Sequence, residues 1–120
     1  MPYGNGATFG GGPASATTDA TWETDFPSKE GRALRGAATC SFRINSGDRP
    51  PTVASSLKTA WNAAGNSPSA SANGAVVTWG ASGTQVSGMS FTINNSKTNV
   101  PQQNGGSVNV GSSGINVQNT

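Results

Sequence analysis

Apolar and polar residues alternate most regularly between residues 38 and 45. The run reads ATCSFRIN, in which every second residue from Ala38 to Ile44 is apolar and the residues between them are polar. Because successive side chains of a strand point to opposite faces, this pattern predicts a half-buried β-strand. The following residues, 45–48 (NSGD), are typical of a turn and would end the strand.

A helical period occurs over residues 52–64. Apolar residues recur there at the spacing of one helix face and form a stripe of Val53, Leu57, Ala60, Trp61 and Ala64. Pro50 and Pro51 suit the first turn of a helix, and Thr52 is a suitable N-cap. Gly65 is typical of the residue that ends a helix. We predict one short helix here, with its apolar stripe packed on a sheet.

Four further segments have the period of a strand. They span residues 75–79, 89–93, 108–110 and 115–117. An Asn-Gly pair at 73–74 precedes the first of them and is typical of a hairpin turn. The last two flank the loop GSSG and predict a hairpin of two short strands.

Residues 1–27 show neither period. Gly and Pro interrupt this segment, and its aromatic residues stand far apart. A disordered tail is one interpretation of such a composition. We favour an extended arm whose aromatic side chains insert into pockets of a neighbouring subunit, because aromatic residues supply much of the binding energy at interfaces. The predicted anchors of this arm are Tyr3, Phe9, Trp22 and Phe26.

These segments together predict a mainly β fold with one short helix. Residues 28–120 would form a small antiparallel β-sandwich or barrel-like domain of about 5–7 short strands, with the helix near residues 52–64. Residues 1–27 would precede it as the extended N-terminal arm. Leu, Ile, Val and Phe together number only 17 in 120 residues. The predicted core is therefore thin, and such domains often gain stability by forming oligomers.

The chain offers few side chains for chemistry. It has no His, one Cys and five carboxylates, and Lys97 is the only charged residue after Lys58. Acid–base, nucleophilic and transition-metal chemistry usually depend on the residue types that are scarce here. Glu23 and Asp25 are close in sequence, but a glycosidase needs its two carboxylates at a fixed separation across a cleft. We expect no enzymatic activity, no cofactor and no metal.

The single cysteine, Cys40, excludes a disulfide within the chain. In a secreted protein it would suggest a disulfide between chains. Because it lies on the apolar side of the strand predicted at 38–45, we interpret it as a small buried hydrophobic residue.

Six of the seven basic residues fall between positions 29 and 58. The predicted partner-binding patch consists of Lys29, Arg32, Arg35, Arg43 and Arg49. Two acidic residues lie in the same window, and no RNA-binding motif accompanies it, so an acidic protein surface is favoured over nucleic acid. A plain solvated face is the alternative. On this interpretation the charged N-terminal half makes the contacts, and the nearly uncharged C-terminal half faces outward.

The N-terminus lacks the basic and apolar regions of a signal peptide, and no apolar run approaches the roughly 20 residues of a membrane span. We expect synthesis in the cytosol, after which the chain either stays there or leaves as part of a larger particle. Uncharged polar strands, short Gly/Ser turns and a low-complexity N-terminal segment resemble tailed-phage capsid decoration (cement) proteins. This resemblance implies synthesis in the host cytoplasm and a final location in the virion.

The resemblance implies a small β-domain bound to the capsid exterior, as a dimer or trimer, whose arm reinforces neighbouring subunits. Its expected partners are capsid or other virion protein subunits, whereas nucleic acid and membranes are not expected. One alternative is a tail, fibre or surface-filament subunit. An alternative of another class is a carbohydrate- or receptor-binding adhesin module.

Overall fold

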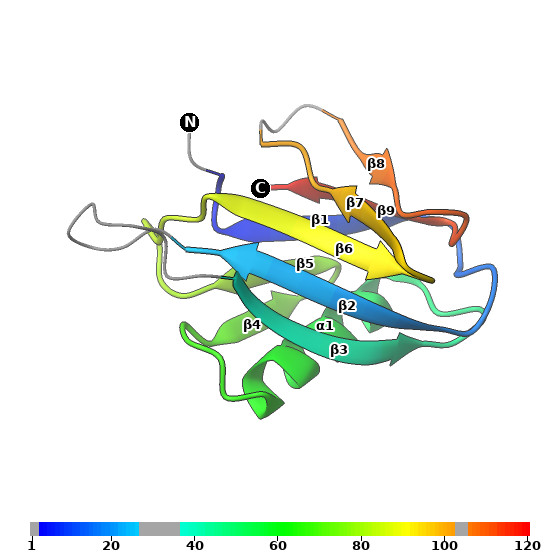
Figure 1. Ribbon diagram of the computed structural model, residues 1–120, viewed down its shortest axis with the longest axis horizontal. Coiled ribbons are helices and arrows are strands. Elements are labelled where there is room, and N and C mark those ends of the chain that lie inside the picture. The colour runs from blue at the N-terminus through cyan, green and yellow to red at the C-terminus, as the bar shows by residue number, and fades with distance from the viewer. Residues whose placement is uncertain (1–2, 27–36, 103–105) are drawn as a thin grey trace.

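The computed structural model describes residues 3–26, 37–102 and 106–120. In this part of the chain, nine strands form two antiparallel sheets that face each other, and one helix packs beside them (Figure 1). The sheets stay separate, so the fold is sandwich-like and not a closed barrel. The expectation of a mainly β chain with one helix is confirmed, but the expected 5–7 strands were too few.

One sheet has five strands in the order β4-β5-β1-β9-β8. Their bounds are β4 Ala70–Asn73, β5 Val76–Trp79, β1 Gly6–Gly11, β9 Ile115–Asn119 and β8 Val108–Asn109. β1 lies at the centre and pairs with β5 and β9. The β8–β9 hairpin was predicted, as was a strand directly after the Asn-Gly turn, and both are confirmed.

The other sheet has four strands in the order β3-β2-β6-β7 and lies at the front of Figure 1. Their bounds are β3 Ala37–Ile44, β2 Thr18–Asp25, β6 Gly88–Ile93 and β7 Ser96–Asn99. β3 and β6 confirm the strands predicted at 38–45 and 89–93. β2 runs between them and is paired along its whole length with β3.

The helix α1 (Pro50–Ala63) confirms the predicted helix and begins two residues earlier. Pro50 and Pro51 occupy its first turn, so the N-cap is Arg49 and not Thr52. Leu57 and Trp61 of the predicted stripe are buried, whereas Ala64 is exposed. The helix therefore fills one open side of the sandwich, against β3 of one sheet and β4 of the other.

Two asparagines at this side satisfy backbone groups of the sheet edges. The side chain of Asn62 accepts a hydrogen bond from the N–H of Ala70 and donates one to its C=O, both at 2.8 Å. A neighbouring strand would satisfy the same two backbone groups. Asn66, just after the helix, donates to the C=O of Thr39 at 2.8 Å. Helix α1 and the turn after it thus cover parts of the edges of β4 and β3, which would otherwise be left unpaired.

Aromatic rings from both sheets meet in the core. Trp22 of β2 stacks on Trp79 of β5, with ring centroids 5.4 Å apart and planes 13° from parallel. The rings of Phe9 and Phe91 lie edge-on to Trp22, with centroids 5.8 and 5.4 Å from the Trp22 centroid. The ring of Trp61, on the helix, lies edge-on to Trp79 with centroids 5.7 Å apart. This cluster joins the two sheets and the helix, and compensates for the small number of aliphatic residues.

The predicted N-terminal arm is wrong, because residues 6–11 and 18–25 are interior strands of the two sheets. Phe9, Trp22 and Phe26 are 2%, 0% and 3% exposed, so they fill the chain's own core and are not free to enter a neighbour's pockets. Tyr3 is partly buried, forms an isolated bridge with Val86, and donates a hydrogen bond to the C=O of Val100. The aromatic residues of this segment therefore stabilise the fold itself.

Cys40 lies in the core, as predicted, and burial raises the pKa of its thiol from 9.0 to about 11. We expect slow reaction with a thiol reagent at pH 8 in the folded protein and fast reaction in urea. A raised pKa means that folding favours the protonated thiol, so this stabilisation is lost as pH rises from about 9 towards 11. The free energy of unfolding should fall more steeply over that range in the wild type than in Cys40→Ala. Equal slopes would contradict the burial of the thiol.

Candidate functional site

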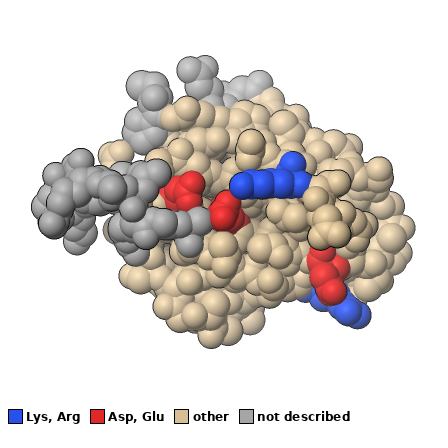
Figure 2. Space-filling view, in the orientation of Figure 1, with Lys and Arg blue, Asp and Glu red and all other residues tan. Residues whose placement is uncertain are grey.

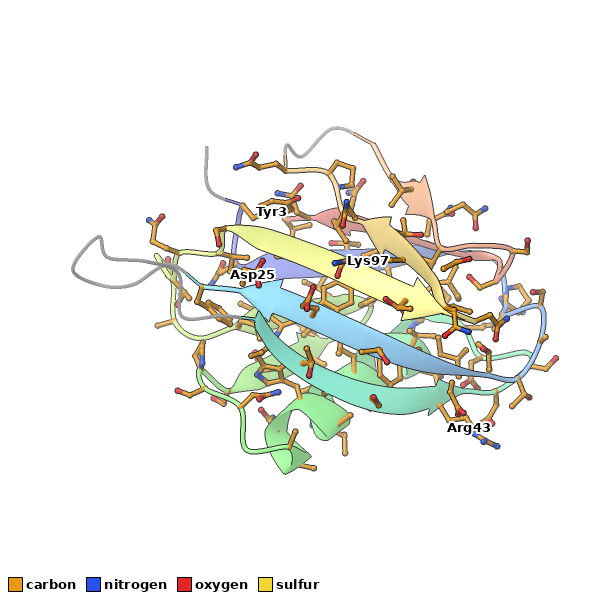
Figure 3. The ribbon with its side chains drawn as sticks, in the orientation of Figure 1. Tyr3, Asp25, Arg43 and Lys97 are labelled. Atoms are coloured by element: carbon orange, nitrogen blue, oxygen red, sulfur yellow. The ribbon has the colours of Figure 1, made fainter. Side chains whose placement is uncertain are left out.

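The outer surface of the four-stranded sheet carries five of the eight charged residues that the structure describes (Figures 2 and 3). Asp19, Glu23 and Asp25 project from β2, Arg43 from β3 and Lys97 from β7. The strand register sets this arrangement, because alternate residues of β2 turn Ala20, Trp22 and Thr24 into the core. We call this surface the charged face.

Two ion pairs cross the charged face. Arg43 Nε lies 3.2 Å from Asp19 Oδ1, and Lys97 Nζ lies 3.3 Å from Glu23 Oε1. The hydroxyl of Ser90 also donates to Glu23, at 3.2 Å. Because three of these four side chains are more than half exposed to water, each pair contributes only about 0–1 kcal/mol to stability. The pairs leave the face with little net charge.

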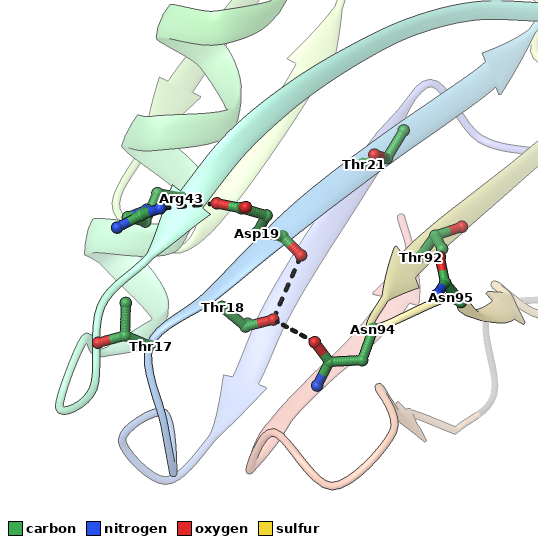
Figure 4. A pocket seen from close by; sticks show the side chains of 8 residues that line it. All are labelled: Thr17, Thr18, Asp19, Thr21, Arg43, Thr92, Asn94 and Asn95. Atoms are coloured by element: carbon green, nitrogen blue, oxygen red, sulfur yellow. Dashed lines mark hydrogen bonds and ion pairs between the residues drawn. The ribbon is translucent and has the colours of Figure 1, made fainter.

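A shallow depression of about 550 Å³ lies at one end of the charged face (Figure 4). We call it the Asn94 depression. It is lined by Thr17, Thr18, Asp19, Thr21, Arg43, Thr92, Asn94 and Asn95. The two asparagines form the tight turn between β6 and β7, with φ of 50° and 64°, values that Asn tolerates better than most residues. Thr18 Oγ1 donates to Asn94 Oδ1 at 3.0 Å, so the turn is tied to the start of β2.

The Asn94 depression offers hydroxyl, amide, carboxylate and guanidinium groups on a fixed backbone. These groups can hydrogen-bond an uncharged polar ligand such as a sugar. None of the lining residues is aromatic, so the depression has no ring on which a sugar could stack. It therefore suits weak polar contacts and not a deeply enclosed ligand.

A smaller depression, of about 180 Å³, lies nearer the other end of the same face. Its lining includes Tyr3, Glu23, Asp25 and Lys97. Burial raises the pKa of Tyr3, which keeps its hydroxyl protonated as the donor to Val100. Glu23 and Asp25, two residues apart on the outward side of β2, both line this depression. Among the described residues, no group of three or more His, Cys, Asp or Glu could hold a metal ion.

Among the residues that the structure describes, the outer surface of the five-stranded sheet carries no charged one. Gly6, Thr8 and Gly10 of β1 lie along the centre of this surface. Thr8 stands opposite Val76 of β5 on one side and Gln118 of β9 on the other. The outward residues of the sheet are Gly6, Thr8, Gly10, Ser71, Asn73, Val76, Thr78, Asn109, Asn116 and Gln118. We call this surface the uncharged face.

Two residues of the predicted basic patch lie in the part of the chain that the structure describes. Arg43 lies on the charged face, paired with Asp19, and Arg49 occupies the N-cap position of helix α1. Lys29, Arg32 and Arg35 lie outside the described residues. The N-terminal and C-terminal halves of the chain are not separate units of the fold, because each sheet combines strands from both halves.

No protein-family model matches this chain, and no curated protein or solved structure matches it either. In the described parts of the chain, no helix has both the length and the hydropathy that crossing a membrane requires.

Proposed function

We propose that this protein is a non-enzymatic structural protein of a viral particle, a decoration protein that binds the outer surface of a tailed-phage capsid and stabilises the shell. The observation that supports this most is the uncharged face. Exposed sheet surfaces usually carry charged residues, which keep proteins soluble and separate. A whole sheet face without them is best accounted for if another protein covers it.

The composition of the uncharged face suits such a contact. Hydroxyl and amide groups can be buried at modest cost when they find hydrogen-bond partners, whereas charged groups cost much more to bury. Charged residues are accordingly depleted at the centres of protein interfaces. At Gly10 no atom lies within 4 Å of where a Cβ would stand, so a partner could approach the backbone of β1 closely.

A capsid lattice would strengthen a contact that is weak in each copy. An oligomer that engages several equivalent sites at once gains avidity without any new contact. A dimer or trimer of this chain would meet that requirement, with the charged face turned towards solvent. Because the contact surface is uncharged, we expect binding to depend little on salt. The N-terminal segment takes no part in this contact as an arm, since β1 and β2 lie inside the sheets.

Substitution of a single threonine tests this proposal. Thr8→Lys places a charge at the centre of the uncharged face, and Thr21→Lys places the same charge at the centre of the charged face. We expect Thr8→Lys to weaken binding to capsids at least about tenfold and Thr21→Lys to leave it unchanged. Co-sedimentation with shells of the capsid protein encoded in the same viral genome would measure binding, and melting curves would verify that both variants fold.

The wild type should also raise the temperature at which the shells rupture. Failure of the wild-type protein to bind shells would contradict the proposed class. Binding that Thr8→Lys and Thr21→Lys weaken equally would contradict the assignment of the contact to the uncharged face.

One observation favours a second candidate function, a carbohydrate-binding adhesin module. The Asn94 depression presents polar groups from three chain segments in one fixed place. If this candidate is right, the protein should bind a glycan array without any capsid. Asn94→Ala should then abolish glycan binding, and Thr8→Lys should not.

A further inference from the structure

β3 is the longest edge strand in the described part of the chain, with eight residues. In an antiparallel ladder, alternate residues turn their N–H and C=O groups towards the neighbouring strand. The side chain of Asn66 donates a hydrogen bond to the C=O of Thr39, which shows that the backbone groups of Thr39 point away from β2. The same alternation turns the backbone groups of Ser41 and Arg43 outwards.

The outward groups of Ser41 and Arg43 have no hydrogen-bond partner among the described residues. The other edges are better protected or shorter. β7 has four residues with Lys97 among them, β8 has two, and Asn62 satisfies Ala70 at the edge of β4. Natural sheets protect long edges because an open one is a template for another strand.

A groove of about 380 Å³ runs beside this open part of β3, between it and helix α1. Its helix wall consists of small side chains, among them Ser55, Ser56, Thr59 and Ala63. On the strand side lies Phe42, a half-buried ring that contacts the core through Phe91. The groove thus combines unpaired backbone groups, room for side chains and a partly apolar surface.

The charges at the groove favour an acidic occupant. Arg43 lines it, and no carboxylate does. Arg49 occupies the N-cap position of α1 without a side-chain capping hydrogen bond, and the first turn of the helix holds no acidic residue to balance the positive end of the helix dipole. Of the nearby carboxylates, Asp19 pairs with Arg43, and Asp48 accepts a hydrogen bond from the backbone N–H of Asn45.

We propose that β3 accepts an extended acidic segment of a partner protein as an additional strand, seated in the groove beside helix α1. The backbone of this segment would pair with Ser41 and Arg43, an apolar side chain would pack on Phe42, and a carboxylate would lie near Arg43. This surface differs from the uncharged face, so the inference does not depend on binding to a capsid.

Two peptides of five residues, of sequence DVDVD and KVKVK, test the charge of the occupant. We would titrate each into the labelled full chain at millimolar concentration and follow the backbone amides by NMR. The expected result is that DVDVD shifts the amides of Ser41, Arg43 and Thr59, binds at least about tenfold more tightly than KVKVK, and weakens with added salt. Equal binding of the two peptides, no binding of DVDVD, or shifts confined to β7 would each overturn the proposal.

Ser41→Pro tests the role of the strand edge. Proline is tolerated where an edge N–H faces solvent, so this variant should keep the fold while it removes one donor and obstructs a new strand. Asn99→Pro makes the same change on the open edge of β7. We expect Ser41→Pro to weaken DVDVD binding at least about tenfold and Asn99→Pro to leave it unchanged. If the wild type instead forms a dimer that Ser41→Pro dissociates, the occupant is a second copy and the proposed acidic partner is wrong.

Discussion

A chain that lacks residues 1–25 should not fold. This deletion removes β1 and β2, which lie inside the two sheets and pair with β5, β9, β3 and β6. It also removes Phe9 and Trp22 from the aromatic cluster. The remaining strands would be left with unpaired edges and an incomplete core. We expect a far-UV circular dichroism spectrum without β-sheet signal and an NMR spectrum without dispersion.

Removal of residues 1–2 alone provides the control, because this shorter deletion leaves every described strand intact. That chain should unfold cooperatively at nearly the temperature of the wild type. If residues 26–120 on their own give a dispersed NMR spectrum and a cooperative melting transition, then the N-terminal segment is a separable arm after all.

Trp22→Ala should destabilise the fold more than any other single truncation to alanine. Trp22 is fully buried and touches rings from β1, β5 and β6. Truncation of a buried tryptophan costs about 3–5 kcal/mol, because it removes apolar contacts and leaves a cavity. A small domain has a free energy of unfolding of only about 5–15 kcal/mol. We therefore expect Trp22→Ala to be largely unfolded at moderate urea concentrations where the wild type is folded.

Two milder variants control for general effects of mutation. Trp22→Phe keeps an aromatic ring at the site and should cost less than Trp22→Ala. Val76→Ala, on the outer surface of β5, should change the free energy of unfolding by less than about 1 kcal/mol. Urea titrations followed by fluorescence would measure all three. Equal destabilisation by Trp22→Ala and Val76→Ala would contradict the central place of Trp22 in the core.

The sequence predicts those elements whose inner faces carry large apolar residues. In β3 the inward positions include Phe42 and Ile44, and in α1 they include Leu57 and Trp61. The apolar residues of both elements therefore recur at a clear strand or helix period. β2 reads TDATWETD and turns Ala20, Trp22 and Thr24 inwards, so Trp22 is the one large apolar residue among its eight. β1 reads GATFGG and likewise has one large apolar residue. Strands of this kind form because they pair with neighbouring strands, and the pattern of their own residues does not identify them.

The candidate surfaces could be predicted even less well than the strands. The uncharged face depends on the order of β4, β5, β1, β9 and β8, in which β1 and β9 pair although they lie more than a hundred residues apart in the sequence. The Asn94 depression likewise requires the turn at Asn94 to meet Thr18. Arg43 could be identified from its residue type, but its pairing with Asp19 depends on the register of β2 and β3. Long-range pairing of this kind leaves no local signal in the sequence.

A cryo-electron microscopy map of the particle that carries this chain tests the central claim most directly. We predict many copies in a regular lattice on the capsid exterior, each with Thr8 and Gln118 of the uncharged face covered by a neighbouring protein. The charged face, with Glu23 and Lys97, should be open to solvent. A map in which the charged face lies against the shell and the uncharged face is bare would contradict the account.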